Sequence, residues 1–165
     1  MDLPDSIQIE DNRARDDFMR GYRLQMEGDL EEAIQAYRSS IGHQETAEAR
    51  TFLGWALSHK DRLDEAIREC QRAIELDPDF GNPYNDIGVY RLKQGDMEAA
   101  KPWFEKALNA PRYDSYCFPH FNLGRIHLYR GHFGDAARHF KEALKERSDF
   151  TKAKDALLKI KHRMN

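Results

Sequence analysis

The sequence predicts an all-α fold built as an array of helix pairs, because small residues recur at a nearly constant interval. An alanine in each second helix and a glycine in each first helix both repeat after 33, 34 and 36 residues. These markers are Ala33, Ala66, Ala100 and Ala136, and Gly21, Gly54, Gly88 and Gly124. Apolar residues between them lie three and four positions apart, which is typical of helices with one buried face. Such a period indicates stacked small units rather than a single globular core.

Close packing explains why the markers are small residues. Two antiparallel helices joined by a short turn must approach closely, and glycine or alanine at the crossing removes the side chain that would separate them. A larger residue at Gly54 or Ala66 is therefore expected to overpack the crossing. Larger side chains, at Tyr37, Phe104 and Phe140, are expected to fill wider gaps.

The register divides the chain into a tail and one continuous domain. Residues 1–13 are predicted to be an acidic, solvated tail, because residues 1–12 carry four acids and no base. Residues 14–165 are predicted to form a single repeat domain. Its units are expected at about 14–46, 47–80, 81–114 and 117–150, followed by a capping helix at about 151–163.

The junctions between units differ in length. The junction at 76–81, Leu-Asp-Pro-Asp-Phe-Gly, keeps the regular step and is expected to give regular stacking. The junction at 109–119 is longer and contains Pro111 and Pro119, which forbid one continuous helix. We expect an ordered, aromatic loop there.

Composition excludes several classes of protein. The chain is 40% hydrophobic and 33% charged, with a net charge of −3 that gives no general case for binding nucleic acid or a membrane surface. No apolar run is long enough to cross a bilayer, and the acidic start does not resemble a signal peptide. Cys70 and Cys117 do not make a disulfide framework. A cytoplasmic location is expected.

The repeated pattern resembles the tetratricopeptide repeat family. The family signature places Leu-Gly, Tyr, Ala, Phe, Ala and Pro at fixed places in 34 residues. The unit at 117–150 carries Leu123-Gly124, Ala136, Phe140 and Ala143, and the two units before it fit similarly. The first unit fits less well, at Arg20 and Ser40. The resemblance implies a right-handed α-solenoid of four helix-turn-helix pairs with a terminal capping helix.

The resemblance also implies a concave groove lined by the first helix of each unit, at its second, fifth, ninth, twelfth and thirteenth places. The groove is predicted to be rich in aromatic and amide side chains, which suit protein interfaces. The candidate binding residues are Phe18, Tyr22, Trp55, Asn85, Phe121, Asn122, Arg125 and Tyr129. The alternative for Trp55 and the other aromatic residues is that they form core between neighbouring units.

A non-catalytic adaptor or assembly scaffold that binds a protein or an extended peptide is the expected function. The tail of a heat-shock chaperone is not the expected partner. The carboxylate clamp that holds such tails needs basic and amide residues at fixed places. This chain has Thr51, Trp55 and Phe118 at three of them, and Asp86 at a fourth would repel a carboxylate.

Uneven charge leaves open a second function, as a structural scaffold that stacks end to end. Residues 1–35 carry a net charge of −6 and residues 138–165 a net charge of +5. Head-to-tail contacts between such ends permit a weak homo-oligomer, whereas the simpler interpretation is two solvated ends. The basic helix could instead touch phosphate, but no nucleic-acid motif accompanies it.

Catalysis and metal binding find little support in the sequence. There is no phosphate-binding glycine loop, nucleophile elbow or His-Glu-x-x-His motif, so no enzyme and no cofactor are expected. His120, His127, His132 and His139 are enriched late in the chain. A metal site needs three or four converging ligands, and their spacing supplies no such set beyond Cys117 and His120. These histidines are expected to be structural or exposed.

Overall fold

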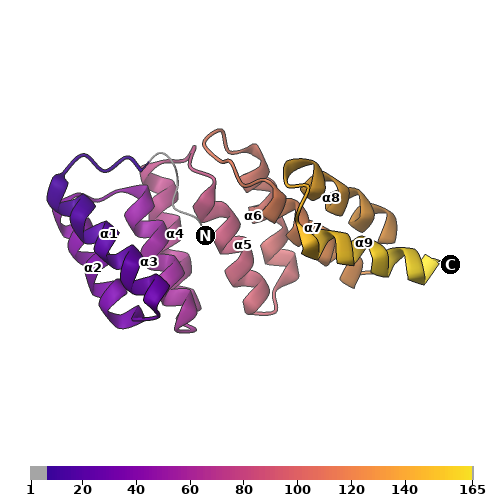
Figure 1. Ribbon diagram of the computed structural model, residues 1–165, viewed down its shortest axis with the longest axis horizontal. Coiled ribbons are helices and arrows are strands. Elements are labelled where there is room, and N and C mark those ends of the chain that lie inside the picture. The colour runs from indigo at the N-terminus through magenta and orange to yellow at the C-terminus, as the bar shows by residue number, and fades with distance from the viewer. Residues whose placement is uncertain (1–6, 165) are drawn as a thin grey trace.

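The computed structural model describes residues 7–164, and over that range the secondary structure is nine α-helices (Figure 1). They are α1 (Asn12–Glu27), α2 (Leu30–His43), α3 (Ala47–His59), α4 (Leu63–Leu76), α5 (Asn82–Lys93), α6 (Met97–Asn109), α7 (Cys117–Tyr129), α8 (Phe133–Glu146) and α9 (Thr151–Met164). The predicted all-α solenoid is confirmed. Within the described range we find no helix with the length and apolarity that a bilayer crossing requires.

The helices are arranged as antiparallel pairs that follow one another along the long axis of the molecule. Figure 1 shows α1 and α2 at one end and α9 beyond the last pair at the other. Each first helix packs against the second helix of its own unit, and each second helix packs against the next unit. The core is therefore a row of small clusters, the largest of which runs from the first unit into α5 of the third.

A glycine lies at the crossing of each helix pair. A Cβ atom added at Gly88 would lie 2.6 Å from the Phe104 ring, and one at Gly124 would lie equally close to Phe140. Tyr37 covers Gly21 in the same way. The large residues thus lie directly over the glycines, and the prediction that they fill wider gaps is wrong.

Cys70 takes the place of the aromatic residue in the second unit. A Cβ atom at Gly54 would lie 3.0 Å from the carbonyl oxygen of Ala66 and 3.1 Å from the Cys70 sulfur, so the crossing is closely packed here as well. The Cys70 side chain is fully buried.

Residues 7–11 pack against the first unit, so this part of the predicted tail is not solvated. Ile9 is only 1% exposed. The side-chain oxygen of Gln44 accepts hydrogen bonds from the backbone N–H groups of Glu10 and Asp11, at 2.9 and 2.8 Å. Burial of one apolar side chain and pairing of two backbone donors explain why the segment is held in place. Residues 1–6 of the predicted tail lie outside the described residues.

The loop between α6 and α7 turns back onto the preceding junction. A parallel β-bridge joins Phe80 to Arg112, in which Gly81 donates to the carbonyl of Arg112 at 3.0 Å and Arg112 donates to the carbonyl of Asp79 at 2.9 Å. Tyr113 is 9% exposed and packs on Gly81 so closely that a Cβ atom there would clash. The predicted ordered aromatic loop is therefore present, and it packs over the junction at 76–81. We call this loop, residues 110–116, the strap.

The Arg112 guanidinium anchors this strap. It donates to the Asp77 carboxylate from Nε at 3.0 Å and to Glu48 Oε1 at 3.0 Å, and it lies 4.3 Å from the centre of the Phe80 ring. The Glu48 side chain is 2% exposed. A buried carboxylate requires a paired cation, so Arg112 compensates the burial of Glu48 across 64 residues of chain.

We expect Gly88→Ala to lower the free energy of unfolding by about 1–3 kcal/mol, because the added methyl group overpacks the contact with Phe104. Gly42→Ala is the matched control. It lies on α2 with no atom within 4 Å of its Cβ position, so a gain of up to about 1 kcal/mol is expected from helix propensity. Urea denaturation measures the free energy of unfolding of both variants. Equal changes in the two variants would contradict a close helix crossing at Gly88.

We expect Arg112→Ala to lower the free energy of unfolding by about 3 kcal/mol, because it leaves the Glu48 carboxylate buried without a cation. Adding Glu48→Gln to this variant should recover part of the loss. Arg68→Ala, at an exposed position of α4, should change stability by less than about 0.5 kcal/mol. An effect of Arg112→Ala as small as that of the control would rule out the strap as a stabilising element.

Candidate functional site

The first helices of the units form one continuous layer. Helix α1 contacts α3, α3 contacts α5 and α5 contacts α7. Within residues 7–164, the second helices of successive units make no comparable contacts. Helices on the inner side of a curved stack lie closer together than those on the outer side, so α1, α3, α5 and α7 line the inner face. The predicted groove residues lie on these helices.

Phe18 is not available in this groove, and its prediction as a groove residue is wrong. The side chain is fully buried, with its ring 5.0 Å from that of Phe52 and 5.6 Å from that of Tyr37 between centroids. Its apolar surface is removed from water by the core of the first two units.

Asn122 is also buried, at 7% exposed. Its side-chain oxygen accepts a hydrogen bond from a guanidinium nitrogen of Arg125 at 3.2 Å. The amide therefore positions Arg125, and a direct contact between Asn122 and a partner does not fit this burial.

Tyr22 and Trp55 are partly buried and belong to one row of aromatic rings. Phe52 lies between them, with its centroid 5.9 Å from that of Tyr22 and 5.8 Å from that of Trp55, in edge-on geometry. Trp55 also contacts the exposed His59 ring at 5.4 Å. These two candidates thus combine core packing with a partly exposed face.

Asn85 is partly buried beside a buried acid. Its side-chain N–H donates weakly to Asp86 at 3.4 Å, and its side-chain oxygen has no partner among the described residues. Asp86 is 6% exposed, and burial raises the pKa of this carboxyl to about 7. The carboxyl is therefore partly protonated at neutral pH.

An apolar pocket of about 670 Å³ lies at the end of the groove nearest the C-terminus. It is lined by residues of α7 and α9, with one residue each from α5 and α6. The lining residues are Leu92, Met97, Arg125, Ile126, Leu128, Tyr129, Lys159 and His162. This volume suits one or two large side chains of a ligand.

Two predicted groove residues, Arg125 and Tyr129, line this pocket. Tyr129 is 77% exposed, and Arg125 is also exposed. Phe121 is partly buried one turn before Arg125, with its ring 5.6 Å from that of Phe140. Of the eight predicted residues, Arg125 and Tyr129 have the freest access to a partner.

Lys159 is a residue that the sequence analysis missed. It is the ninth residue of α9, which places it where Arg125 lies in α7. Neither cation is paired with a carboxylate in the part of the chain that the structure describes. Counting the repeat places onward into the capping helix would have found it.

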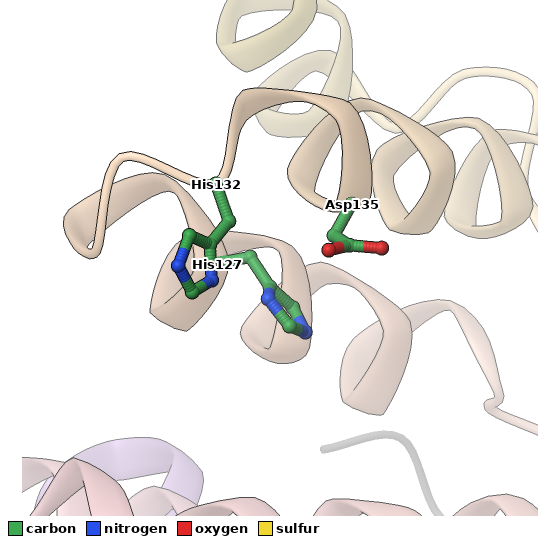
Figure 2. Close-up of side chains that lie close together, drawn as sticks. All are labelled: His127, His132 and Asp135. Carbon is green, nitrogen blue, oxygen red and sulfur yellow. The ribbon is translucent and has the colours of Figure 1, made fainter.

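The late histidines gather between α7 and α8. Nδ1 of His120 lies 3.2 Å from Nδ1 of His139, and the His139 ring stacks on that of His127 with centroids 5.4 Å apart. Burial lowers the pKa of His139 to about 4 and also lowers the pKa values of His120 and His127. Among the described residues, the group that could hold a metal ion is His127, His132 and Asp135 (Figure 2).

Three tetratricopeptide repeat profiles match the chain, over residues 18–79, 82–113 and 117–150. Small glutamine-rich tetratricopeptide repeat-containing protein 2 of Saccharomyces cerevisiae is 26% identical over 111 residues, which cover 66% of this chain and 32% of the relative. The chain spans about a third or less of the length of the first curated relatives that it matches.

Solved structures share the arrangement of helices. The structure of PilF from Pseudomonas aeruginosa has a TM-score of 0.84 at 19% identity, covering 92% of this chain and 69% of that one. The second repeat domain of Spaghetti (RPAP3), bound to an HSP90 peptide, has a TM-score of 0.57 at 27% identity, covering 60% and 93%. Repeat profiles along most of its length and this shared fold show that the chain belongs to the tetratricopeptide repeat family, whose members are protein-interaction and assembly modules.

Proposed function

We propose that this chain is a non-catalytic module that binds an extended peptide or a protein surface along its groove, with the α7–α9 pocket as the main anchoring site. The observation that carries the proposal is the apolar pocket of about 670 Å³, whose lining includes Arg125 and Lys159. Neither cation has a carboxylate partner among the residues that the structure describes. Apolar pockets with a few convergent polar groups are the usual form of a ligand site.

The chemistry of the lining residues specifies the occupant. Leu92, Ile126 and Leu128 favour an aliphatic or aromatic side chain, because its burial removes apolar surface from water. Arg125 and Lys159 favour a carboxylate beside that side chain, and Arg can bind one through two parallel hydrogen bonds. The expected ligand is therefore a segment in which a large apolar residue lies next to Asp, Glu or the C-terminal carboxylate.

The row Tyr22, Phe52 and Trp55 supports a second contact, towards the other end of the groove. The partly exposed faces of Tyr22 and Trp55 offer flat apolar surface to a ligand. A ligand that reaches from the pocket to this row would have to be extended.

The similar domain of Spaghetti is bound to the acidic HSP90 peptide SRMEEVD, which supports peptide binding as the function of this groove. We still expect this chain not to bind a chaperone tail, because Thr51, Trp55 and Phe118 occupy places where the clamp needs basic and amide groups. The buried, partly protonated Asp86 contributes less to this exclusion than its sequence position suggests.

Other classes of function have less support. We expect no enzymatic activity and no binding to nucleic acid or membranes. Both cysteines are free buried thiols, which suits the reducing cytoplasm that we predict as the location.

Selection of a random peptide library on phage against the immobilised protein tests the anchoring pocket. We expect enriched peptides to place an aliphatic or aromatic residue next to an acidic one. For a synthetic peptide of that consensus, Arg125→Glu should weaken binding by at least about tenfold, because the carboxylate then meets a like charge. The melting temperature should not change, since Arg125 is exposed.

Arg68→Glu is the matched control, because it makes the same charge change at an exposed position of α4, away from the groove. Its affinity for the peptide should equal that of the wild type. Enriched peptides that lack acidic residues, or that bind the two variants equally, would show that the pocket does not anchor the ligand.

End-to-end self-association is the second candidate function, and one observation favours it. Leu158 on α9 is 57% exposed, with the exposed Lys154 and Lys161 on the same helix. At the other end, a depression of about 420 Å³ on α1 and α2 is lined by Leu24, Arg20, Gln35 and the acids Glu31 and Glu32. The two ends are therefore complementary in charge and each offers apolar surface.

Light scattering at low and high salt tests this association. If the ends bind one another, the mass at low salt should exceed that of a monomer and should fall when salt screens the charges. Leu158→Glu should give a monomer in both conditions. A monomeric wild-type protein at both salt concentrations would exclude the scaffold.

A further inference from the structure

The turn between α7 and α8 brings two histidines together. Gly131 adopts a left-handed conformation with φ of 77° and ends α7. The N–H of Gly131 donates to the carbonyl of Leu128 at 3.1 Å, and that of His132 donates to the carbonyl of His127 at 2.9 Å. This pair of hydrogen bonds defines a Schellman motif, in which the residue after the glycine lies next to the residue five positions before it.

The same turn recurs in every unit, but its contacting pair differs. In the first three units the pairs are Leu24 with Asp29, Leu57 with Arg62, and Arg91 with Asp96. In the fourth unit both members are histidines, and their ring centroids lie 6.0 Å apart. The repeat geometry therefore does not require histidine at either place.

Asp135 adds a third potential ligand from the first turn of α8. One ligand atom from each of His127, His132 and Asp135 can be chosen so that all three lie within 4.8 Å of one another. Figure 2 shows the three side chains side by side at the turn. In a tetrahedral zinc site, ligand atoms about 2.0–2.1 Å from the metal lie roughly 3.3 Å apart. Small rotations of the exposed His132 and Asp135 side chains can bring the three ligand atoms from within 4.8 Å to this shorter separation.

The surroundings of His127 favour a ligand role. Its Nδ1 atom is buried and has no hydrogen-bond partner among the described residues. The His139 ring stacks on it at an interplanar angle of 11°, which fixes the plane of the imidazole. Asp135 is engaged by Arg138 at 3.2 Å, but both side chains are more than half exposed, so a metal ion can displace this weak pair.

We propose that His127, His132 and Asp135 bind one divalent transition-metal ion at the α7–α8 turn. Two imidazoles and one carboxylate suit Zn²⁺ and its neighbours Ni²⁺ and Cu²⁺, whereas Ca²⁺ and Mg²⁺ prefer oxygen ligands alone. Three protein ligands leave a fourth position for water. The ion joins the end of α7 to the start of α8 and so stabilises the last unit by binding the folded state. This site departs from the sequence-based expectation that the late histidines bind no metal.

Calorimetric titration of the untagged protein with zinc chloride tests the site, with calcium chloride as the comparison salt. We expect one zinc ion per chain, no calcium binding, and a melting temperature that rises with zinc and returns after chelation. Addition of Co²⁺ should give visible absorption bands that report nitrogen and oxygen ligands. His132→Ala and Asp135→Asn should each weaken zinc binding by at least about tenfold.

These two substitutions are at exposed positions, so the variants should fold, which circular dichroism checks. His43→Ala removes an exposed histidine at the end of α2 and should bind zinc as the wild type does. Absence of zinc binding at millimolar concentration would overturn the site. Undiminished affinity in either ligand variant, or an equal loss in His43→Ala, would also overturn it.

Discussion

The close crossing of the two helices in each unit is the constraint on which the rest of the structure depends. At Gly88 and Gly124 the aromatic ring of the second helix occupies the space of the missing side chain. The ring fills the crossing of its own unit and also joins a core cluster with the next helix pair or α9. Other faces of the first helix contact neighbouring first helices. Because α1, α3, α5 and α7 form one layer in this way, side chains from different units meet in one groove.

The regular part of this architecture could be predicted from the sequence, but the contents of the groove could be predicted only in part. The periodicity predicts the helix pairs because the same crossing recurs in each unit. It does not predict how far a groove side chain is buried, because that depends on the residues of the adjacent unit. At the fifth place of a unit, Phe18 is fully buried, whereas Phe121 is only partly buried. Lys159 lies on the capping helix, beyond the last repeat, so the repeat pattern does not mark it, although α9 continues the same places.

The loop between α6 and α7 shows why an irregular element is harder to predict. Its two additional residues and its order were predictable from spacing and proline content. The position of the loop over the junction was not predictable, because Arg112 of the loop is anchored by Glu48, 64 residues away in the sequence. Once Arg112 pairs with a carboxylate that is 2% exposed, the loop is held against the junction at Phe80. A connection between the third and fourth units thus reinforces the contact between the second and third.

The two proposed sites share α7 but use different faces of it. Arg125, Leu128 and Tyr129 are three and four positions apart, so they lie on one face and line the pocket. His127 lies on another face, where it stacks against His139 of α8. On a continuous helix His127 and His132 would point in different directions, and only the left-handed Gly131 brings them together, which is why their spacing did not suggest a metal site. An ion at the turn can therefore hold α7 against α8 without entering the pocket, and the groove remains open to its ligand.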